Sequence, residues 1–316
     1  MRFSLICLLA ALMAGCATGT RVNTASQPAV RPPTVAPVDT TVFEAPGPVG
    51  PIAQPGEVEE PLPGGVIDWS AKTVRARGTG VLDPGATNKA QARLMAERAA
   101  VVVAQRNLLE IIKGVRVDSD TRVQNFMTDY DVVYSRVDGI IKGARQLGPA
   151  KYDSIAGTVE VELEVPIYGE QSLTDALVPV LGSGPGDVQA SMSPQVRQFL
   201  EQYSGLVLDG GAAGVKPAMF PKIYDENGNL LLDTREYAAY LGQPGQAAFQ
   251  FISDLDKVLA RPEFAKVPLV LKVKKVTGLL GADIVLSGGD ADKLKWLKDG
   301  FKYLVGAGRF LMKVLL

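Results

Sequence analysis

The chain of 316 residues carries 33 lysine and arginine residues against 34 aspartate and glutamate residues, for a formal net charge of −1. It contains no histidine and only two cysteines, Cys7 and Cys16. The lack of histidine excludes Ser-His-Asp and Cys-His nucleophile systems and every metal or haem site built on imidazole. Because the net charge is close to zero, no overall field attracts nucleic acid, and we expect no nucleic-acid partner.

The first sixteen residues have the pattern of a secretory signal peptide. Arg2 supplies a positive charge, and Leu5–Leu12 forms an apolar run that is too short to cross a bilayer. Small residues that end at Gly15 lead directly into Cys16. This ending resembles the lipobox of bacterial lipoproteins, with Met13 in the place where leucine is usual. The alternative is an ordinary secretory peptide that happens to precede a cysteine.

The lipobox resemblance implies cleavage between Gly15 and Cys16 and attachment of lipid, including palmitate, to Cys16. Two or three acyl chains hold a protein firmly on a membrane, whereas a single chain is marginal. Ala17 stands where an aspartate would signal retention in the inner membrane, so the resemblance implies the periplasmic face of the outer membrane. Cys7 would leave with the signal peptide (residues 1–15), and the mature chain would then have no free thiol.

Residues 16–65 form a linker that is rich in proline. Ten of the 21 prolines fall between residues 17 and 65, where Phe43 is the only aromatic residue and lysine is absent. Such a segment cannot bury a core, so we expect a disordered, partly polyproline-II tether. Its use would be to let the folded part stand away from the membrane, and the alternative is a spacer without a selected length.

A first folded unit is predicted for residues 66–170. Alternating apolar and polar residues predict a strand at Val74–Thr79. Either Asp83-Pro84 or Thr87 is suited to cap a long helix that ends at Gly114. The second half of this helix has one apolar face, made of Val101, Ala104, Leu108, Ile111 and Ile112.

Two further strands are expected at Ile141–Leu147 and Val159–Ile167, and together they complete an α+β unit. Three carboxylates line the outer face of the second strand: Glu160, Glu162 and Glu164. We expect these carboxylates to pair with Arg75 and Arg77 on a neighbouring strand, although a hard cation is the alternative partner.

A family resemblance rests on this first unit. The alanine-rich helix sequence from Ala90 to Ala100, the glycines from Gly139 to Gly143 and the strand Val159–Ile167, behind a lipobox, resemble the Lpp-twenty family of bacterial outer-membrane lipoproteins. The resemblance covers Trp69–Tyr168, about a third of the chain. The family includes the flagellar basal-disk lipoprotein FlgP, and its fold is similar to the N-terminal domain of the flagellar assembly protein FlgT. The resemblance therefore implies a structural role, in a disk or ring around a flagellar motor.

A second unit of α/β type is predicted for residues 203–316, after a hinge and a short helix in residues 171–202. Gly182–Gly186 is the expected hinge, and Asn227-Gly228 predicts a hairpin whose two central residues both have positive φ. The remaining expected elements are a helix at Ser193–Gln202, a strand at Leu206–Leu208, a helix over Ala248–Leu259, strands at Val267–Val276 and Ile284–Leu286, a helix at Asp290–Val305 and a terminal strand at Phe310–Leu316.

The last segment is basic, with ten basic and four acidic residues from Lys266 onward. Four lysines lie on its expected helix: Lys293, Lys295, Lys298 and Lys302. They are candidate contacts for an anionic surface such as peptidoglycan or lipopolysaccharide. The alternative is a solvated helix face, because Asp292 and Asp299 lie among them.

No motif in the sequence marks a catalytic, cofactor or metal site. Asp225, Asn227 and Asn229 are spaced like the opening of a calcium loop, but the closing glutamate is missing and a hairpin turn explains them. Gly210–Lys216 has the glycines of a phosphate loop, but Pro217 replaces its hydroxyl residue. We therefore expect a protein that is not an enzyme and that needs no cofactor.

The sequence favours an outer-membrane lipoprotein of α+β fold, with two small sandwich-type domains after the tether and a structural or assembly role. Self-association or binding to envelope or flagellar proteins is expected through Val102 and Leu109, which interrupt the polar side of the long helix, and through β-addition at the strand Phe310–Leu316. The alternative is a lipoprotein that binds cell wall or glycan through the basic C-terminal unit.

Overall fold

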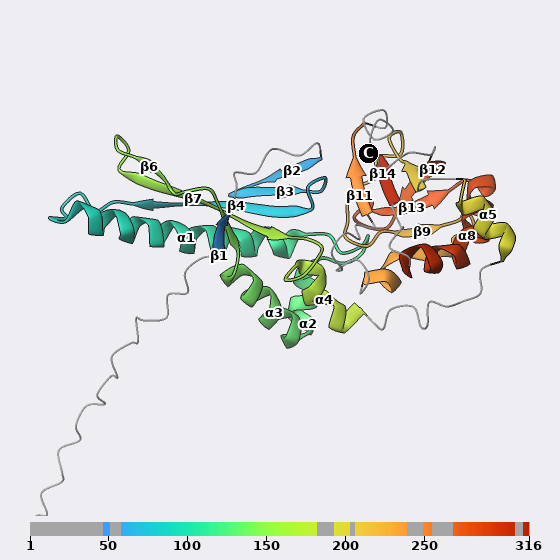
Figure 1. The fold of residues 1–316 in the computed structure, drawn as a ribbon, viewed down its shortest axis with the longest axis horizontal. Helices are drawn as coiled ribbons and strands as arrows, with labels where there is room; N and C mark the ends of the chain where they lie inside the picture. Colours follow the sequence, from blue (N-terminus) through green and yellow to red (C-terminus); the bar gives the residue numbers. More distant parts are fainter. Residues whose placement is uncertain are drawn as a thin grey trace, which may run out of the picture. The chain divides into compact units, whose positions relative to one another are not determined.

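Two mixed seven-stranded sheets with flanking helices make up the described part of the chain (Figure 1). The computed structural model describes residues 47–50, 58–181, 193–202, 206–238, 249–254, 268–306 and 312–315. Gly15, Cys16 and the expected hinge Gly182–Gly186 lie outside these residues. Helices combine with antiparallel and mixed sheets, so the predicted α+β class is confirmed.

The first sheet has the strand order β1-β5-β7-β4-β3-β2, and β6 also pairs with β7. Its centre is the antiparallel pair of β4 and β7, which are in register from Thr73 opposite Pro166 to Val81 opposite Thr158. The strands are β1 Gly47–Gly50, β2 Glu59–Leu62, β3 Gly65–Asp68, β4 Thr73–Val81, β5 Arg145–Leu147, β6 Lys151–Asp153 and β7 Thr158–Pro166.

The helix α1, Lys89–Gly114, runs along β4 and β7 (Figure 1). Its N-cap is Asn88, whose side chain accepts a hydrogen bond from the Gln91 amide, so neither of the two predicted caps is used. The predicted apolar face is confirmed, since all five of its residues are buried. Toward the helix N-terminus the buried residues are only alanines: Ala92, Ala96 and Ala100.

These alanines lie against glycines of β4, and the helix and sheet approach each other closely. A methyl group at Gly80 would lie 1.9 Å from the carbonyl oxygen of Ala96, and one at Gly78 would lie 2.1 Å from that of Ala100. Since neither position has room for a side chain, small residues on both elements set the distance between α1 and the sheet.

Two helices follow α1, and the second of them covers the start of the strand predicted at Ile141–Leu147. They are α2, Val123–Asp129, and α3, Asp131–Lys142. Val133, Val137 and Ile141 recur every four residues and are buried on one face of α3. The strand predicted for Ile141–Leu147 is therefore wrong at its start, and only its end forms β5.

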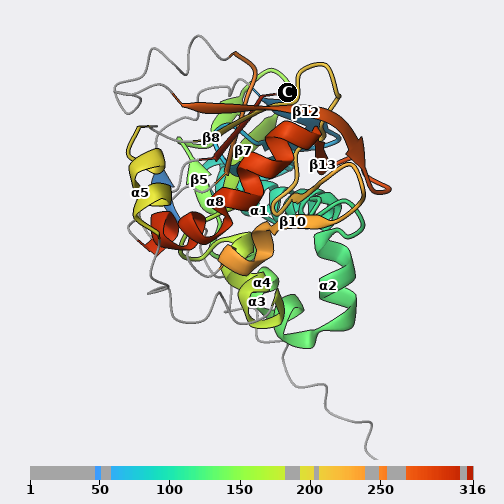
Figure 2. The same cartoon turned by 90° about the vertical axis from the view of Figure 1, so that its right-hand side faces the viewer.

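The second sheet has the strand order β10-β9-β13-β12-β8-β14-β11. Its strands are β8 Leu206–Asp209, β9 Lys222–Tyr224, β10 Leu230–Asp233, β11 Phe249–Ile252, β12 Leu269–Thr277, β13 Asp283–Leu286 and β14 Met312–Leu315. A short 3-10 helix η1, Thr234–Tyr237, follows β10. The helix α8, Gly288–Gly306, packs beside α5, Pro194–Leu200, and β10 (Figures 1 and 2).

Three further predictions from the sequence need correction. The predicted linker contains β1 and β2, and β2 tolerates Pro61 because it is an edge strand with one unpaired side. Within the expected helix over Ala248–Leu259, Phe249–Ile252 forms the strand β11, and residues 255–259 lie outside the described residues. The terminal strand β14 lies between β8 and β11, so its backbone groups already have partners on both sides and it is not an open edge for β-addition.

The two sheets are joined by the loop from Arg116 to Arg122, which follows α1. The Ser119 hydroxyl donates to the Thr277 carbonyl over 2.8 Å, and its oxygen accepts from the amides of Ala282 and Asp283. Ser119 is fully buried, and all of these partners belong to the β12–β13 hairpin. One short side chain thereby satisfies two buried amides and bonds the Thr277 carbonyl as well.

Aromatic and arginine side chains extend this junction. The Trp69 ring lies edge-on to the ring of Phe251 in β11, with 5.7 Å between the ring centroids. The Arg116 guanidinium carbon lies over the Trp69 ring, 5.8 Å from its centroid. Arg116 donates to the Pro217 carbonyl over 2.6 Å, and Tyr168 donates to the Met219 carbonyl over 2.9 Å. Buried residues of both sheets consequently belong to one hydrophobic cluster.

We expect Gly278→Ala to lower the free energy of unfolding by about 2–4 kcal/mol, measured by urea denaturation. Gly278 has a φ of +82°, and an added methyl group would lie 2.1 Å from the Cβ of Ser119. The matched control is Gly228→Ala, with a φ of +81° and open space around it, which should cost only about 1 kcal/mol. Equal losses in the two variants would contradict a tightly packed Ser119 loop.

Candidate functional site

The lysines proposed as surface contacts are partly engaged in ion pairs. Lys293 lies 2.8 Å from Asp290, and Lys295 lies 3.1 Å from Asp225 and 3.8 Å from Asp292. The side chains of Lys298 and Lys302 lie outside the described part of the structure. The two described lysines are thus neutralised by neighbouring carboxylates, as in the solvated-face interpretation.

The three glutamates on the outer face of β7 each have a basic partner. Glu162 pairs with Arg77 over 3.4 Å, Glu160 lies 3.8 Å from Lys151, and Glu164 pairs with Arg145. The predicted pairing is therefore right for Arg77 and wrong for Arg75. Arg75 is buried and bonds Glu59 and Asp68 instead, because β2 and β3 continue the sheet on that side.

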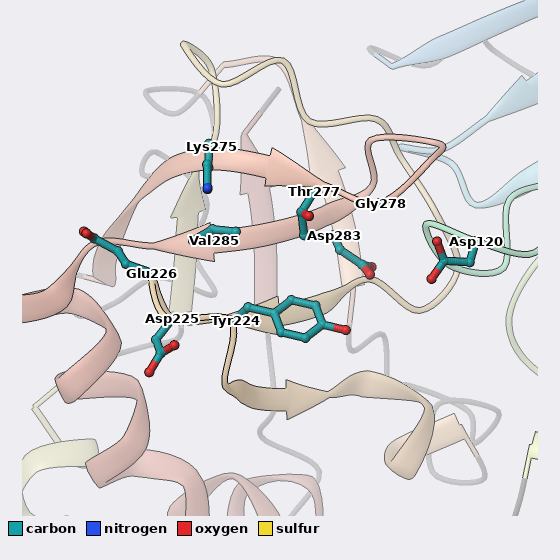
Figure 3. Close-up of a pocket in the computed structure, with 10 residues that line it drawn as sticks. Asp120, Tyr224, Asp225, Glu226, Lys275, Thr277, Gly278, Asp283 and Val285 are labelled. Carbon is teal, nitrogen blue, oxygen red and sulfur yellow. The ribbon is translucent and has the colours of Figure 1, made fainter.

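A pocket of about 290 Å³ lies on one face of the second sheet, between β9, β12 and β13 (Figure 3). The pairings of Val285 with Tyr224 and Lys275, and of Asp283 with Thr277, place these five side chains on the same face. The opposite face carries the buried Ile284 and Leu286. The other lining residues come from three loops and are Asp120, Asp225, Glu226, Gly228 and Gly278.

The charges of the pocket are separated (Figure 3). The carboxylates of Asp283 and Asp120 and the hydroxyl of Tyr224 lie toward one end, whereas Lys275 and Glu226 lie toward the other. Asp120 belongs to the loop that carries Ser119, so the junction between the sheets also builds one wall of this pocket.

Asp283 is the buried carboxylate of the pocket, with 2 % of its surface exposed. Its Oδ1 accepts a 2.9 Å hydrogen bond from the Lys222 amide. Within the described ranges its Oδ2 has no hydrogen-bond donor. Burial is the main cause that raises the pKa of the Asp283 carboxyl, and the negative charges of Asp118 and Asp120 act in the same direction.

The cations nearest to Asp283 are held by another buried carboxylate, Asp118. Asp118 Oδ2 lies 3.3 Å from Lys222 Nζ and 3.5 Å from an Arg235 nitrogen. Burial alone would raise the pKa of Asp118, but hydrogen bonds from Asp120 and Thr121 and the charge of Lys222 lower it overall. Asp118 is therefore paired with two cations, whereas among the described residues Asp283 has no cation within ion-pair distance.

The hairpin between β9 and β10 confirms the predicted turn but not its type. Gly228 has a φ of +81°, whereas Asn227 does not have a positive φ. The Asp225 carboxylate accepts hydrogen bonds from the amides of Asn227 and Asn229 and holds the loop. The Asn229 side chain is the first of the groups that lower the pKa of Asp225 to about 2, so this stabilisation is lost as the pH falls through that value.

A larger pocket of about 600 Å³ lies beside α3, β5 and β7. Its basic residues already have partners, because Arg145 pairs with Glu164 and Arg136 donates to the Asp175 carbonyl over 3.1 Å. The pocket of Asp283 is the better candidate site, since its buried carboxylate has a free acceptor atom.

The sequence did not predict Asp283, Asp118 or Asp120 as site residues. One available signal was an aspartate directly before the apolar strand Ile284–Leu286, where a charge has to be buried or paired. Asp283 contacts a loop more than 160 positions earlier in the chain, where its amide donates to the Ser119 hydroxyl. No local sequence pattern indicates that contact.

A protein-family model matches part of the chain. Residues 205–305 match the family model described as Treponema pallidum Tp0624, second domain. The match covers most of the second sheet and less than half of the chain. No curated protein matches the chain.

Within the described ranges there is no group of three or more aspartate, glutamate, cysteine or histidine side chains that could hold a metal ion. Among the helices that the structure describes, none combines the length and the apolar character that crossing a membrane requires.

We expect Asp283→Asn to raise the melting temperature at pH 7, measured by calorimetry. The raised pKa means that folding disfavours the ionised carboxylate, and asparagine keeps the acceptor for the Lys222 amide without the charge. The gain should shrink as the pH falls through the folded-state pKa, because the native carboxyl then becomes neutral too.

Asp118→Asn is the matched variant and should lower the melting temperature at pH 7. It leaves Lys222 and Arg235 without their shared carboxylate and should cost about 1.5–3 kcal/mol at pH 7. A destabilised Asp283→Asn together with an unaffected Asp118→Asn would show that the electrostatic roles are assigned wrongly.

Proposed function

We propose that this chain is an outer-membrane lipoprotein on the periplasmic face, with a structural or assembly role. The observation that carries the proposal is a group of exposed apolar side chains at one end of the first sheet. Its members are Val81, Leu94, Met95, Tyr152 and Ile155. We call this group the apolar end.

The contacts of the described chain bring these residues to the same end. Val81 pairs with Thr158 at the end of β4 and β7, and Tyr152 pairs with Val159 beside them. The Arg93 guanidinium lies 4.9 Å from the ring of Tyr152 and connects the start of α1 to β6. Leu94 and Met95 follow Arg93 directly.

The exposure of the apolar end favours binding of a protein. Ile155 is 98 % exposed and Val81 is 71 % exposed, although each is a residue that usually contributes to a core. Gathered apolar side chains on a surface are typical of sites of protein association. The aliphatic and aromatic composition suits another apolar protein surface better than a charged polymer.

The apolar end differs from the two contact surfaces expected from the sequence, which were the long helix at Val102 and Leu109 and the strand Phe310–Leu316. Leu109 is partly buried and packs against the core of its own chain, so it offers little surface. Val102 is exposed on α1 to 36 %, and β14 is not an edge strand. The apolar end offers more accessible apolar surface than either.

A flagellar disk or ring remains the most specific form of the proposal. It is supported by the resemblance of Trp69–Tyr168 to the Lpp-twenty family and by an α1–β4–β7 unit that matches the expected helix-on-ribbon fold. The alternative of a glycan-binding role through the four lysines is less favoured, because Lys293 and Lys295 already pair with carboxylates.

Lipidation is tested by mass spectrometry of the protein isolated from bacterial membranes. We expect a mature N-terminus at Cys16 that carries two or three acyl chains. Cys16→Ser should abolish both the lipid and the membrane anchoring, whereas the matched variant Cys7→Ser should change neither. A free thiol at position 16, or a chain that keeps its leader, would refute the anchoring.

Association is tested by sedimentation velocity of the mature protein over a range of concentrations. We expect oligomers that Ile155→Asp weakens by about tenfold or more in Kd, because a buried charge is costly at an apolar contact. The matched control is Leu279→Asp, since Leu279 is 90 % exposed and lies on the β12–β13 turn.

The outcome that speaks against the proposal is a wild-type protein that stays monomeric at every concentration and cross-links to no envelope protein. An equal effect of the two aspartate substitutions would place the contact elsewhere on the molecule.

A further inference from the structure

We propose that the pocket on the second sheet binds a ligand through a primary ammonium group, which Asp283 and Asp120 accept at its acidic end. This site is independent of the lipid anchor and of the apolar end, and it adds a ligand-binding activity to the proposed structural role.

The buried carboxylate supplies the first part of the argument. Asp283 is 98 % buried, as its 2 % exposure shows, and its side chain lines the pocket. A carboxylate oxygen accepts up to two hydrogen bonds, yet within the described residues Oδ2 of Asp283 has none. The described buried side-chain atoms that lack a hydrogen-bond partner are Thr73 Oγ1 and Arg75 Nε, so Asp283 Oδ2 keeps contact with solvent in the pocket. A largely buried carboxylate with one acceptor atom open to a pocket is a candidate for binding a ligand.

The neighbouring charges determine what the pocket accepts. Lys222 and Arg235 are held by Asp118, and Asp225 and Glu226 pair with Lys295 and Lys274. No described residue forms a hydrogen bond or ion pair with the Asp120 side chain. Asp283 and Asp120 are therefore the two carboxylates left to receive a positive charge from outside.

Tyr224 makes the acidic end suitable for an ammonium group. Its hydroxyl lies on the same side as the two carboxylates (Figure 3). Its aromatic ring adds an electron-rich surface that attracts cations. An ammonium group has three donors and can bond two carboxylates and a hydroxyl oxygen at once.

Size and the opposite end define the rest of the ligand. About 290 Å³ is at the lower limit of ligand pockets and suits one sugar or one amino-acid side chain. Lys275 at the other end and Thr277 beside Asp283 can donate to hydroxyl or carboxylate oxygens. The same chemistry occurs in an amino sugar of a glycan and in a lysine-type side chain of a peptide, and the experiment separates these sources.

The test is isothermal titration calorimetry on the mature full-length protein at pH 7. The probes are glucosamine and L-lysine, and the comparison compounds are N-acetylglucosamine and Nα,Nε-diacetyl-lysine, in which the ammonium groups are blocked. We expect binding of at least one probe and at least about tenfold weaker binding of its acetylated form. The tighter probe identifies the source as glycan or peptide.

The variants locate the site. Asp283→Asn should weaken binding of the probe by about tenfold or more, and Asp120→Asn should weaken it less because Asp120 is exposed. The matched control is Glu110→Gln, an exposed carboxylate on α1 that should leave the affinity unchanged. Calorimetric unfolding of each variant shows that it is folded.

Three results would overturn the inference. They are no binding of either probe at tens of millimolar, equal binding of free and acetylated compounds, and binding that survives Asp283→Asn in a folded protein. Calcium ions serve as a further probe, and tighter binding of calcium than of both amines would also overturn it. None of these results bears on lipidation or self-association, so this inference fails or stands separately from the proposed function.

Discussion

The Ser119 hydroxyl sits inside the turn of the β12–β13 hairpin and bonds backbone groups on both of its sides. This contact brings the loop after α1 onto the second sheet, and Gly278 allows it because no side chain fits between them. Once the loop is in place, Asp118 meets Lys222 and Arg235, and Asp120 becomes a wall of the pocket. The merged core and the candidate ligand site both depend on this docking.

The pKa values of the buried carboxylates in this region depend on the hydrogen bonds and charges around each of them. Burial raises the pKa of both Asp118 and Asp283. In Asp118 the hydrogen bonds from Asp120 and Thr121 and the charge of Lys222 outweigh burial and lower the pKa, whereas in Asp283 the pKa stays raised. Two aspartates in the same neighbourhood thus differ in their tasks, one structural and one available to a ligand. The distinction comes from their partners, since the residue type is the same.

The molecule uses its two sheets differently. The first sheet and α1 pack closely through alanine and glycine, and this leaves the larger apolar residues at their end without cover. The second sheet presents a polar pocket on the face opposite its core. The proposed association surface and the proposed ligand site lie on separate sheets and so would not compete, and the Ser119 junction connects the two sheets.

Periodicity in the sequence determined the α+β class, the inward-facing residues of β7 and the buried face of α1, because alternation and helical spacing are local signals. It also indicated that Arg77 pairs with a glutamate of β7, which needs only that two strands be neighbours. The tertiary structure decided that Arg75 is buried with Asp68, that β14 is an inner strand and that Ile141 belongs to a helix. Only the tertiary structure placed Asp283 and Asp120 in the same pocket, because the Asp283 amide bonds the loop that carries Ser119 and Asp120. That loop is distant in the sequence, and no spacing within a single segment encodes such a contact.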